Sequence, residues 1–174
     1  MENRLSKYEE EMPDICNQKG LVSKLVNWGF FNAPASSNHH GNYEGGLFDH
    51  SYAVAEELVM LTQWHGLKRQ RPESPYIVGM FHDLCKVDNY IGNVDRSSFE
   101  YSNKTLLKGH GDKSVMLLST LMPLTMEEVA CIRYHMGAFT PKEEWEYYSR
   151  AVNLYPNVLW THQADMIASQ VKGV

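Results

Sequence analysis

The stretch from Leu47 to Trp64 reads LFDHSYAVAEELVMLTQW, and its apolar residues recur with the period of an amphipathic helix. Gly66, two residues further on, predicts where this helix ends. Helical signals of the same kind extend to both sides, over residues 21–28, 76–87, 112–121, 125–135, 140–154 and 156–173. The predicted fold class is therefore all-α, a helical bundle.

Capping residues and prolines mark several of these helix starts. Thr125 is followed three residues later by Glu128, which is the pattern of a capping box. Pro75 and Pro156 suit the first turn of the helices that follow them. Residues 88–105 differ, because apolar and aromatic residues there flank a polar centre, which favours a short β-hairpin or an ordered loop. No linker or repeat divides the chain, so a single domain over residues 1–174 is predicted.

Composition limits the classes of function. Apolar residues make up 43% of the 174 residues and charged residues 21%, which suits a globular protein with one sizeable core. A net charge of -5 argues against long nucleic acid held through a basic surface. A nucleotide or short oligonucleotide at a metal site stays compatible with this charge, because the metals would supply the positive charge.

The cysteines and the apolar runs indicate a cellular location. Cys16, Cys85 and Cys131 form no CxxC pair, so neither a disulfide framework nor a cysteine-rich zinc site is indicated. Cys85 is expected to be a small buried residue. The first residues are charged and lack a signal-peptide core, and no apolar run reaches the roughly 20 residues of a membrane span. A cytoplasmic protein without membrane contact is predicted.

Histidines and aspartates carry the strongest functional signal in the chain. His50, His82, His110 and His135 recur at intervals of about 25 to 32 residues, each on or beside a different predicted helix. Asp83 follows His82 directly, and Asp165 lies 30 residues beyond His135. One histidine on a helix is ordinarily a packed core or surface residue. Six such residues spread over the bundle predict a metal site between facing helices.

The types of these residues indicate which metals would bind. Imidazole suits Zn, Fe, Ni, Mn or Co, and carboxylate suits the harder metals of that range. Four histidines and two aspartates can hold two metals, with Asp83 as the natural bridge between them. Two metals about 3.5 to 4 Å apart can clamp a phosphoryl group and lower the pKa of a shared water.

Short motifs around these residues resemble those of the HD superfamily of metal-dependent phosphohydrolases. The sequence GGLFDHS at 45–51 resembles the GGLxxHS motif, and HDLCK at 82–86 resembles the HDxxK core. GHG at 109–111 and YHMG at 134–137 are similar to the two later histidine motifs of the members that bind two metals, and ADMIAS at 164–169 resembles the closing aspartate motif. The resemblance covers residues 39–169. It is nearest to HD domains attached to 3′-to-5′ exoribonucleases, whose OB domain has no counterpart in this sequence.

The resemblance implies a role for each matching residue. His50, His82, Asp83 and Asp165 would hold one metal, and His110 and His135 would hold a second together with the bridging Asp83. Lys86 matches a lysine that contacts phosphate in many HD enzymes; a solvated lysine at a helix end is its structural alternative. The implied cofactors are two divalent transition metals, drawn from Mn, Fe, Co, Ni and Zn, or else Mg.

Weaker candidates surround this set. His39 and His40 lie in a glycine-containing loop, where they would contact substrate or simply form part of a polar loop. Arg133 is a candidate for binding an anion, although a helix would turn it about 160° away from His135. His162 precedes Asp165 by three residues, and it would either orient that carboxylate or pack in the bundle.

The function predicted from these residues is hydrolysis of a small phosphate ester, either a monoester or a diester, on a nucleotide or short oligonucleotide. A hydroxide activated by two metals would attack phosphorus, with Asp83 and Lys86 as the catalytic residues. Two alternatives stay open. One is a mixed-valent diiron oxygenase of the HD type, which has the same ligands, and the other is a non-catalytic nucleotide-binding module. Aromatic residues on the late predicted helices would suit a homodimer.

Overall fold

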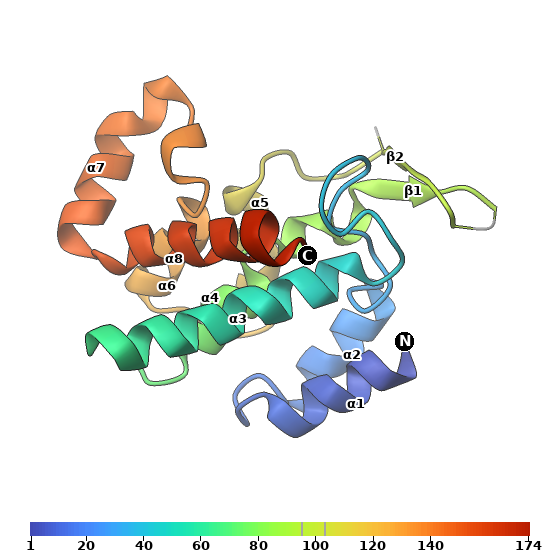
Figure 1. Cartoon of the computed structure of the whole chain (residues 1–174), viewed down its shortest axis with the longest axis horizontal. Helices are drawn as coiled ribbons and strands as arrows, with labels where there is room; N and C mark the ends of the chain where they lie inside the picture. The colour runs from blue at the N-terminus through green and yellow to red at the C-terminus, as the bar shows by residue number, and fades with distance from the viewer. Residues whose placement is uncertain (95, 103) are drawn as a thin grey trace.

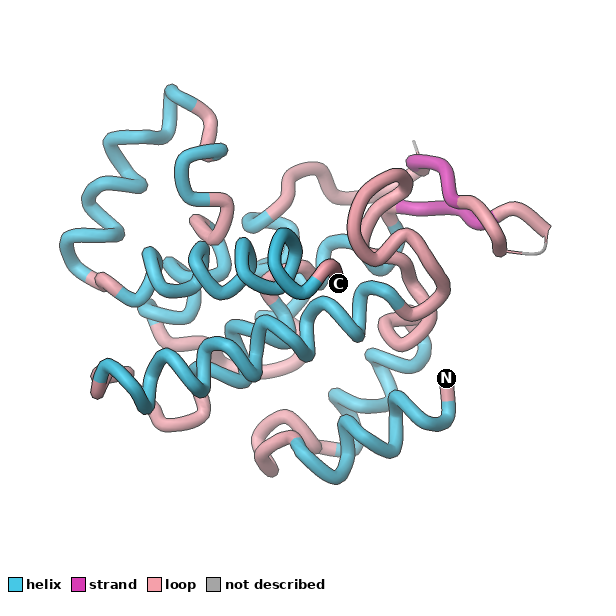
Figure 2. Tube along the Cα trace, viewed as in Figure 1, coloured by secondary structure: helices cyan, strands magenta, loops and turns pink. Residues whose placement is uncertain are grey.

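The fold is predominantly helical, as a computed structural model that describes residues 1–94, 96–102 and 104–174 shows (Figures 1 and 2). The α-helices and strands run, in chain order, as α1 (Glu2–Glu11), α2 (Lys19–Asn27), α3 (Gly46–His65), α4 (Ser74–Phe81), β1 (Tyr90–Gly92), β2 (Phe99–Tyr101), α5 (Gly111–Ser119), α6 (Met126–Arg133), α7 (Trp145–Leu154) and α8 (Asn157–Met166). Short 3₁₀ segments η1 (Leu84–Asp88), η2 (Gly137–Phe139) and η3 (Lys142–Glu144) connect them, and the π-helical η4 (Ile167–Lys172) continues α8.

The long helix α3 lies at the centre of the bundle (Figure 1). It contacts α4, α8 and η4, while α5 and α6 pack against each other and α6 contacts α4 and α8. Helices α1 and α2 lie on the opposite side of α3 from α8 (Figure 1). The core between these helices is aromatic and aliphatic, and its fully buried members include Phe30, Phe48, Leu58, Phe81 and Ile132.

Several predicted features are confirmed. Helix α3 ends at Gly66, which has a left-handed conformation with a φ of 58°. Thr125 and Glu128 form the capping box at the start of α6. Residues in the 88–105 segment form a two-stranded antiparallel hairpin, in which Tyr90 pairs with Tyr101 and Gly92 with Phe99. The all-α bundle with a small hairpin is therefore confirmed as the fold class.

Two predicted helices end earlier than their sequence patterns indicated. The helix predicted over 76–87 stops at Phe81, and the chain turns at Asp83, whose φ and ψ are -104° and 18°, into the 3₁₀ segment η1. The helix predicted to carry both Arg133 and His135 stops at Arg133. In both places the histidine ring bonds to the carbonyl three residues back, that of Gly79 for His82 and that of Ile132 for His135. Each histidine thus sits at a helix end.

Two further differences concern the start of α7 and the presence of α1. Thr140 makes no side-chain cap, and α7 begins only at Trp145, after the 3₁₀ segment η3. The sequence patterns also missed α1, which is strongly charged and buries only one of its residues, Tyr8. The Tyr8 hydroxyl donates to the carbonyl of Cys16 at 2.8 Å. A helix anchored by one aromatic residue leaves almost no periodic signal.

Within the described residues, none of the helices combines the length and the apolar character that a membrane crossing requires.

All three cysteines are free and buried, which predicts slow thiol chemistry in the native protein. Burial raises the pKa of Cys16, Cys85 and Cys131 to about 12 in each case, against about 8.5 for an exposed thiol. At about pH 8, labelling with a thiol reagent is expected to be about a thousandfold slower in the folded chain than in the unfolded one, where all three react.

The same shift predicts a pH dependence of stability. Because folding raises these pKa values, the thiols leave the free energy of unfolding unchanged below about pH 8.5. As the pH rises from there towards 12, where the folded thiols ionise, the free energy of unfolding decreases. Denaturant titrations at increasing alkaline pH measure this decrease. Rapid labelling of one cysteine in native protein would contradict its burial.

Candidate metal centre

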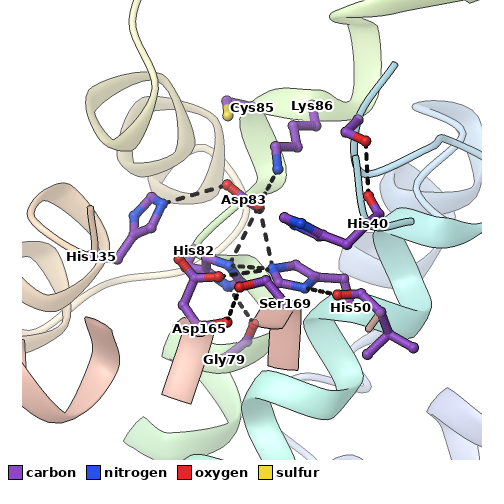
Figure 3. Close-up of polar contacts among 12 residues, drawn as sticks. His40, His50, Gly79, His82, Asp83, Cys85, Lys86, His135, Asp165 and Ser169 are labelled. Carbon is purple, nitrogen blue, oxygen red and sulfur yellow. Dashed lines mark hydrogen bonds and ion pairs between the residues drawn. The ribbon is translucent and has the colours of Figure 1, made fainter. Parts of the chain in front are cut away.

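Six histidine and aspartate side chains converge at the middle of the bundle from five places in the chain. Figure 3 labels all of them except His110. His50 comes from the second turn of α3, and His82 and Asp83 come from the turn between α4 and η1. His110 precedes α5, His135 follows α6, and Asp165 lies in the last turn of α8. Their donor atoms form three overlapping groups, within each of which the atoms lie 4.8 Å or less apart: His50–His82–Asp83, His82–His135–Asp165 and Asp83–Cys85–His110.

The carboxylate of Asp83 lies between two pairs of histidines. Its Oδ2 atom is 3.7 Å from His50 Nε2 and 3.5 Å from His82 Nε2. Its Oδ1 atom is 3.0 Å from His110 Nε2 and 3.5 Å from His135 Nε2. One oxygen of a single carboxylate thus faces each pair, which is the arrangement that a bridging ligand requires.

Asp165 and Lys86 complete the inner set of charges. Asp165 Oδ1 lies 3.2 Å from His50 Nε2, on the same side as the first histidine pair. Lys86 Nζ pairs with Asp83 Oδ2 at 2.6 Å, one turn along the chain from the aspartate (Figure 3).

Close backbone approach brings the second histidine pair together. A Cβ atom on Gly111 would lie 2.2 Å from the carbonyl oxygen of Arg133, so only glycine lets the start of α5 meet the end of α6 here. His110 stands directly before this glycine, and His135 stands two residues after Arg133. The GHG motif therefore has a packing reason as well as a chemical one.

Backbone carbonyls fix the ring orientation of three of the histidines. The Nδ1 atoms of His50, His82 and His135 lie 2.9, 2.8 and 2.7 Å from the backbone oxygens of Val174, Gly79 and Ile132 respectively. A carbonyl can only accept, so each Nδ1 carries the proton and each Nε2 presents a lone pair. This outer contact is the usual support of a metal-binding histidine.

His110 has a different outer partner. Its Nδ1 atom lies 3.1 Å from the sulfur of Cys85, which is fully buried. The backbone N–H of Cys85 in turn donates to Ser114 Oγ at 3.0 Å. Cys85 is therefore buried as predicted, and it also occupies the position that carbonyls hold behind the other three histidines.

The nitrogen and oxygen atoms at this centre are better placed to bind divalent cations than to form hydrogen bonds with one another. His50 and His82 bring their Nε2 atoms to 3.3 Å, and His110 and His135 bring theirs to 3.1 Å. Since the Nδ1 protons of three of these rings are assigned to carbonyls, each close pair contains at least one unprotonated nitrogen. Asp83 Oδ1 is buried and accepts no well-oriented hydrogen bond from the described residues. Converging lone pairs and an orphaned carboxylate oxygen are what a bound cation would satisfy.

The protonation states also suit metal binding. Burial lowers the pKa of His82 to about 3, and the nearby Asp83 charge opposes this only in part. Burial disfavours ionised Asp83, but the Lys86 ammonium and the imidazoles of His82 and His110 outweigh it and hold the pKa of that carboxyl well below its usual range. The pKa of Asp165 is likewise lowered, because the imidazoles of His50, His82 and His135 around it outweigh its burial. Neutral imidazole and ionised carboxylate are the forms that ligate metals.

A cavity of about 690 Å³ opens onto this centre. Asp83, His110 and Asp165 line it, and so do Lys86 and three of the weaker candidates, His39, His40 and His162. The ring of His40 lies 4.9 Å from that of His50, centroid to centroid. A larger groove of about 980 Å³ lies between α1 and α3, but its described lining contains none of the six candidate ligands.

His162 and Arg133 each have partners within the protein. His162 Nδ1 lies 2.9 Å from the carbonyl oxygen of His135, so this ring supports the His135 turn, and no contact with the Asp165 carboxylate is described. Arg133 pairs with Asp112 and with Glu144, the latter at 3.0 Å. It lines a separate cavity of about 440 Å³, which shares His110, Met136 and Phe139 with the first.

Other residues that line the cavity were not among the candidates predicted from the sequence. Ser169 and Gln170 face the cavity from η4, and Met136, Phe139 and Met166 add apolar surface. The spacing of Asp165 and Ser169, four residues on a predicted helix, was a usable signal for one of them. Nothing in the local pattern around Phe139 distinguishes it from a core aromatic.

Comparisons with known proteins give one relative of known activity. The chain is 30% identical over 116 residues to a dihydroneopterin 2′,3′-cyclic phosphate phosphodiesterase from Methanocaldococcus jannaschii. The match covers 56% of this chain and 45% of the relative, so the chain spans less than half of that protein's length. No family model matches the chain, and neither does any solved structure. The chain is thus distantly similar to a phosphodiesterase, and its buried His/Asp groups have the composition of a metal site.

Proposed function

We propose that this chain is a metal-dependent phosphohydrolase of the HD superfamily, with its motifs between residues 39 and 169 of one domain. Its substrate would be a small, nucleotide-like phosphate ester. The observation that carries the proposal is the position of Asp83, whose two oxygens face two separate histidine pairs at 3.0 to 3.7 Å. The distant similarity to a phosphodiesterase supports the same class of reaction.

The proposed ligands divide between two metals. His50, His82 and Asp165 would hold the first and His110 and His135 the second, with Asp83 shared. Two divalent metals held in this way would lower the pKa of a bound water and neutralise the charge of a phosphate. The Nδ1 contacts to Val174, Gly79 and Ile132 would keep the imidazole lone pairs directed inward throughout.

Lys86 is proposed to bind substrate phosphate. Burial works against its charge, but the adjacent Asp83 carboxylate outweighs burial and raises the pKa of Lys86, so it stays an ammonium ion. Its Nζ atom lines the cavity at 2.6 Å from Asp83, and this places a fixed positive charge beside the shared ligand. A phosphate oxygen reaching the centre would meet this charge.

The experiment that tests the proposed function pairs metal analysis with two generic substrates. Purified chain is analysed for metals and then assayed on bis(p-nitrophenyl) phosphate and p-nitrophenyl phosphate with added Mn, Co, Ni or Mg. About two metals per chain and hydrolysis of either ester are expected. Two irons with oxygen uptake and no hydrolysis would instead favour the diiron alternative. A chain that binds no metal would contradict the proposal altogether.

Substituting Lys86 by methionine is expected to lower kcat/KM by about 10- to 100-fold, the usual loss for a charge-assisted hydrogen bond. Methionine keeps the length and apolar stem of the side chain, so metal content should stay near that of the wild type. Lys104→Met changes an exposed lysine beside the hairpin and serves as the matched control. Full activity in Lys86→Met, measured by initial rates, would remove Lys86 from the phosphate site.

A further inference from the structure

The cavity at the proposed metal centre carries more apolar surface than phosphate chemistry needs. Met136 and Phe139 reach it from the turn after His135, Met166 from the residue after Asp165, and Tyr90 from strand β1. These four side chains share one cavity of about 690 Å³ with the candidate ligands, a volume suited to a ligand of nucleoside size. The non-phosphate part of the substrate therefore has an apolar surface to contact.

Phe139 is the most exposed of these apolar side chains, at 70%. Its backbone is nevertheless firmly placed, because its N–H donates to the carbonyl of Met136 at 3.0 Å within η2. Gly137 in this turn has a φ of 55°, and a Cβ atom there would lie 2.6 Å from the ring of His162. Since His162 also bonds to the carbonyl of His135, the turn that carries Phe139 is locked to a candidate ligand. An exposed aromatic ring on a well-placed backbone at a cavity is suited to stacking.

Gln170 supplies a polar group to the same cavity through an unusual turn. It lies five residues after Asp165, which in an α-helix would turn it about 140° away from that residue. The π-helical segment η4 has wider turns, and both Asp165 and Gln170 line the cavity. Gln170 is exposed, and its described hydrogen bond is a long one of 3.5 Å to Ser169 Oγ. Its amide can both donate to and accept from the edge of a ring.

Positive charge in the cavity is sparse. Among the described lining residues, Lys86 is the one lysine or arginine, and Asp83 already pairs with it. Arg133 is engaged with Asp112 and Glu144 and lines the neighbouring cavity. Polyphosphate chains are ordinarily held by several lysine or arginine side chains in addition to metals. This lining suits a substrate with a single phosphate.

We infer that the site takes an ester of one phosphate with one planar heterocyclic group, which stacks on Phe139 and hydrogen-bonds through its edge to Gln170. This inference rests on the proposed function, because it assumes that phosphate binds at the Asp83 centre. It assigns recognition of the ring to two side chains that lie outside the six candidate ligands.

Binding measurements on the metal-loaded chain test the inference, with a metal that supports binding but no hydrolysis of the probes during the titration. Adenosine 5′-monophosphate, ribose 5-phosphate and adenosine triphosphate are the probes, and calorimetry gives each Kd. The monophosphate is expected to bind about tenfold or more tightly than ribose 5-phosphate, which lacks the ring. The triphosphate is expected to bind no more tightly than the monophosphate.

Two variants with matched controls assign the effect to residues. Phe139→Ala is expected to weaken binding of adenosine monophosphate about tenfold, and Gln170→Ala about fivefold, with ribose 5-phosphate unaffected. Trp64→Ala, at an equally exposed aromatic residue near the end of α3, and Gln163→Ala, at an exposed glutamine of α8, should change neither. Metal content of every variant should match the wild type.

The outcomes separate this inference from the proposed function. Equal binding of adenosine monophosphate and ribose 5-phosphate, or much tighter binding of the triphosphate, would overturn the inference if the chain holds metal and hydrolyses either generic ester. If Trp64→Ala or Gln163→Ala weakened binding of adenosine monophosphate relative to ribose 5-phosphate as much as the test variants do, the assignment to Phe139 and Gln170 would be overturned. Absence of metal and of hydrolysis in the wild-type chain would instead contradict the proposed function.

Discussion

Asp83→Asn is expected to reduce bound metal from about two ions per chain to about one or fewer, and turnover by about a thousandfold or more. Asparagine keeps the shape of the side chain but replaces one carboxylate oxygen with an NH₂ group, which donates hydrogen bonds and does not ligate metals. Because each oxygen of Asp83 faces a different histidine pair, either orientation of the amide would lose one of the two proposed sites. A thousandfold loss corresponds to about 4 kcal/mol of transition-state stabilisation.

The control for this variant is Asp49→Asn, at the residue just before His50. Asp49 accepts two hydrogen bonds of 2.8 Å from Arg4, and its side chain is partly exposed, so its loss should cost at most about 1 kcal/mol of stability. Metal content and turnover should stay within about twofold of the wild type. Circular dichroism and thermal unfolding check that both variants fold. Two retained metals and normal rates in Asp83→Asn would refute its bridging role.

The sequence predicted the fold class and the residue types at the centre for clear physical reasons. Helical periodicity is local, so α3 with its end at Gly66, and α6 with its Thr125–Glu128 capping box, follow directly from residues near one another. The candidate ligands stood out because histidines and aspartates recur on or beside separate predicted helices. Their convergence depends on how helices far apart in the sequence pack in the bundle, which only the structure shows.

Tertiary contacts explain what the sequence patterns left out. The ends of α4 and α6 came two to six residues early, since His82 and His135 bond to carbonyls at helix ends. Backbone carbonyls carry no sequence signature, so the partner of His50 at Val174, 124 residues away, was not predictable. The π-helical turn that brings Gln170 to the cavity has no local signal either. Outer contacts and cavity walls therefore needed the structure.

His110→Ala is expected to separate the two proposed metal sites. The ring of His110 is 35% exposed at the mouth of the cavity, so its truncation should leave little empty volume and a folded chain. Bound metal should fall from about two ions per chain to about one, because His50, His82, Asp83 and Asp165 keep their positions. Turnover should drop by about a hundredfold or more, since one metal would then carry the charge that two had shared.

Metal analysis and titration calorimetry of His110→Ala give the readout that activity alone cannot. His65→Ala is the matched control, because His65 is exposed at the end of α3 and its ring stacks on Trp160 at 4.5 Å, outside the described lining of the centre. It should keep both metals and normal turnover. A centre with one metal would behave differently, since His110→Ala would then retain the wild-type metal content. In that case His110 and His135, with their Nε2 atoms 3.1 Å apart, would act on substrate rather than hold a second ion.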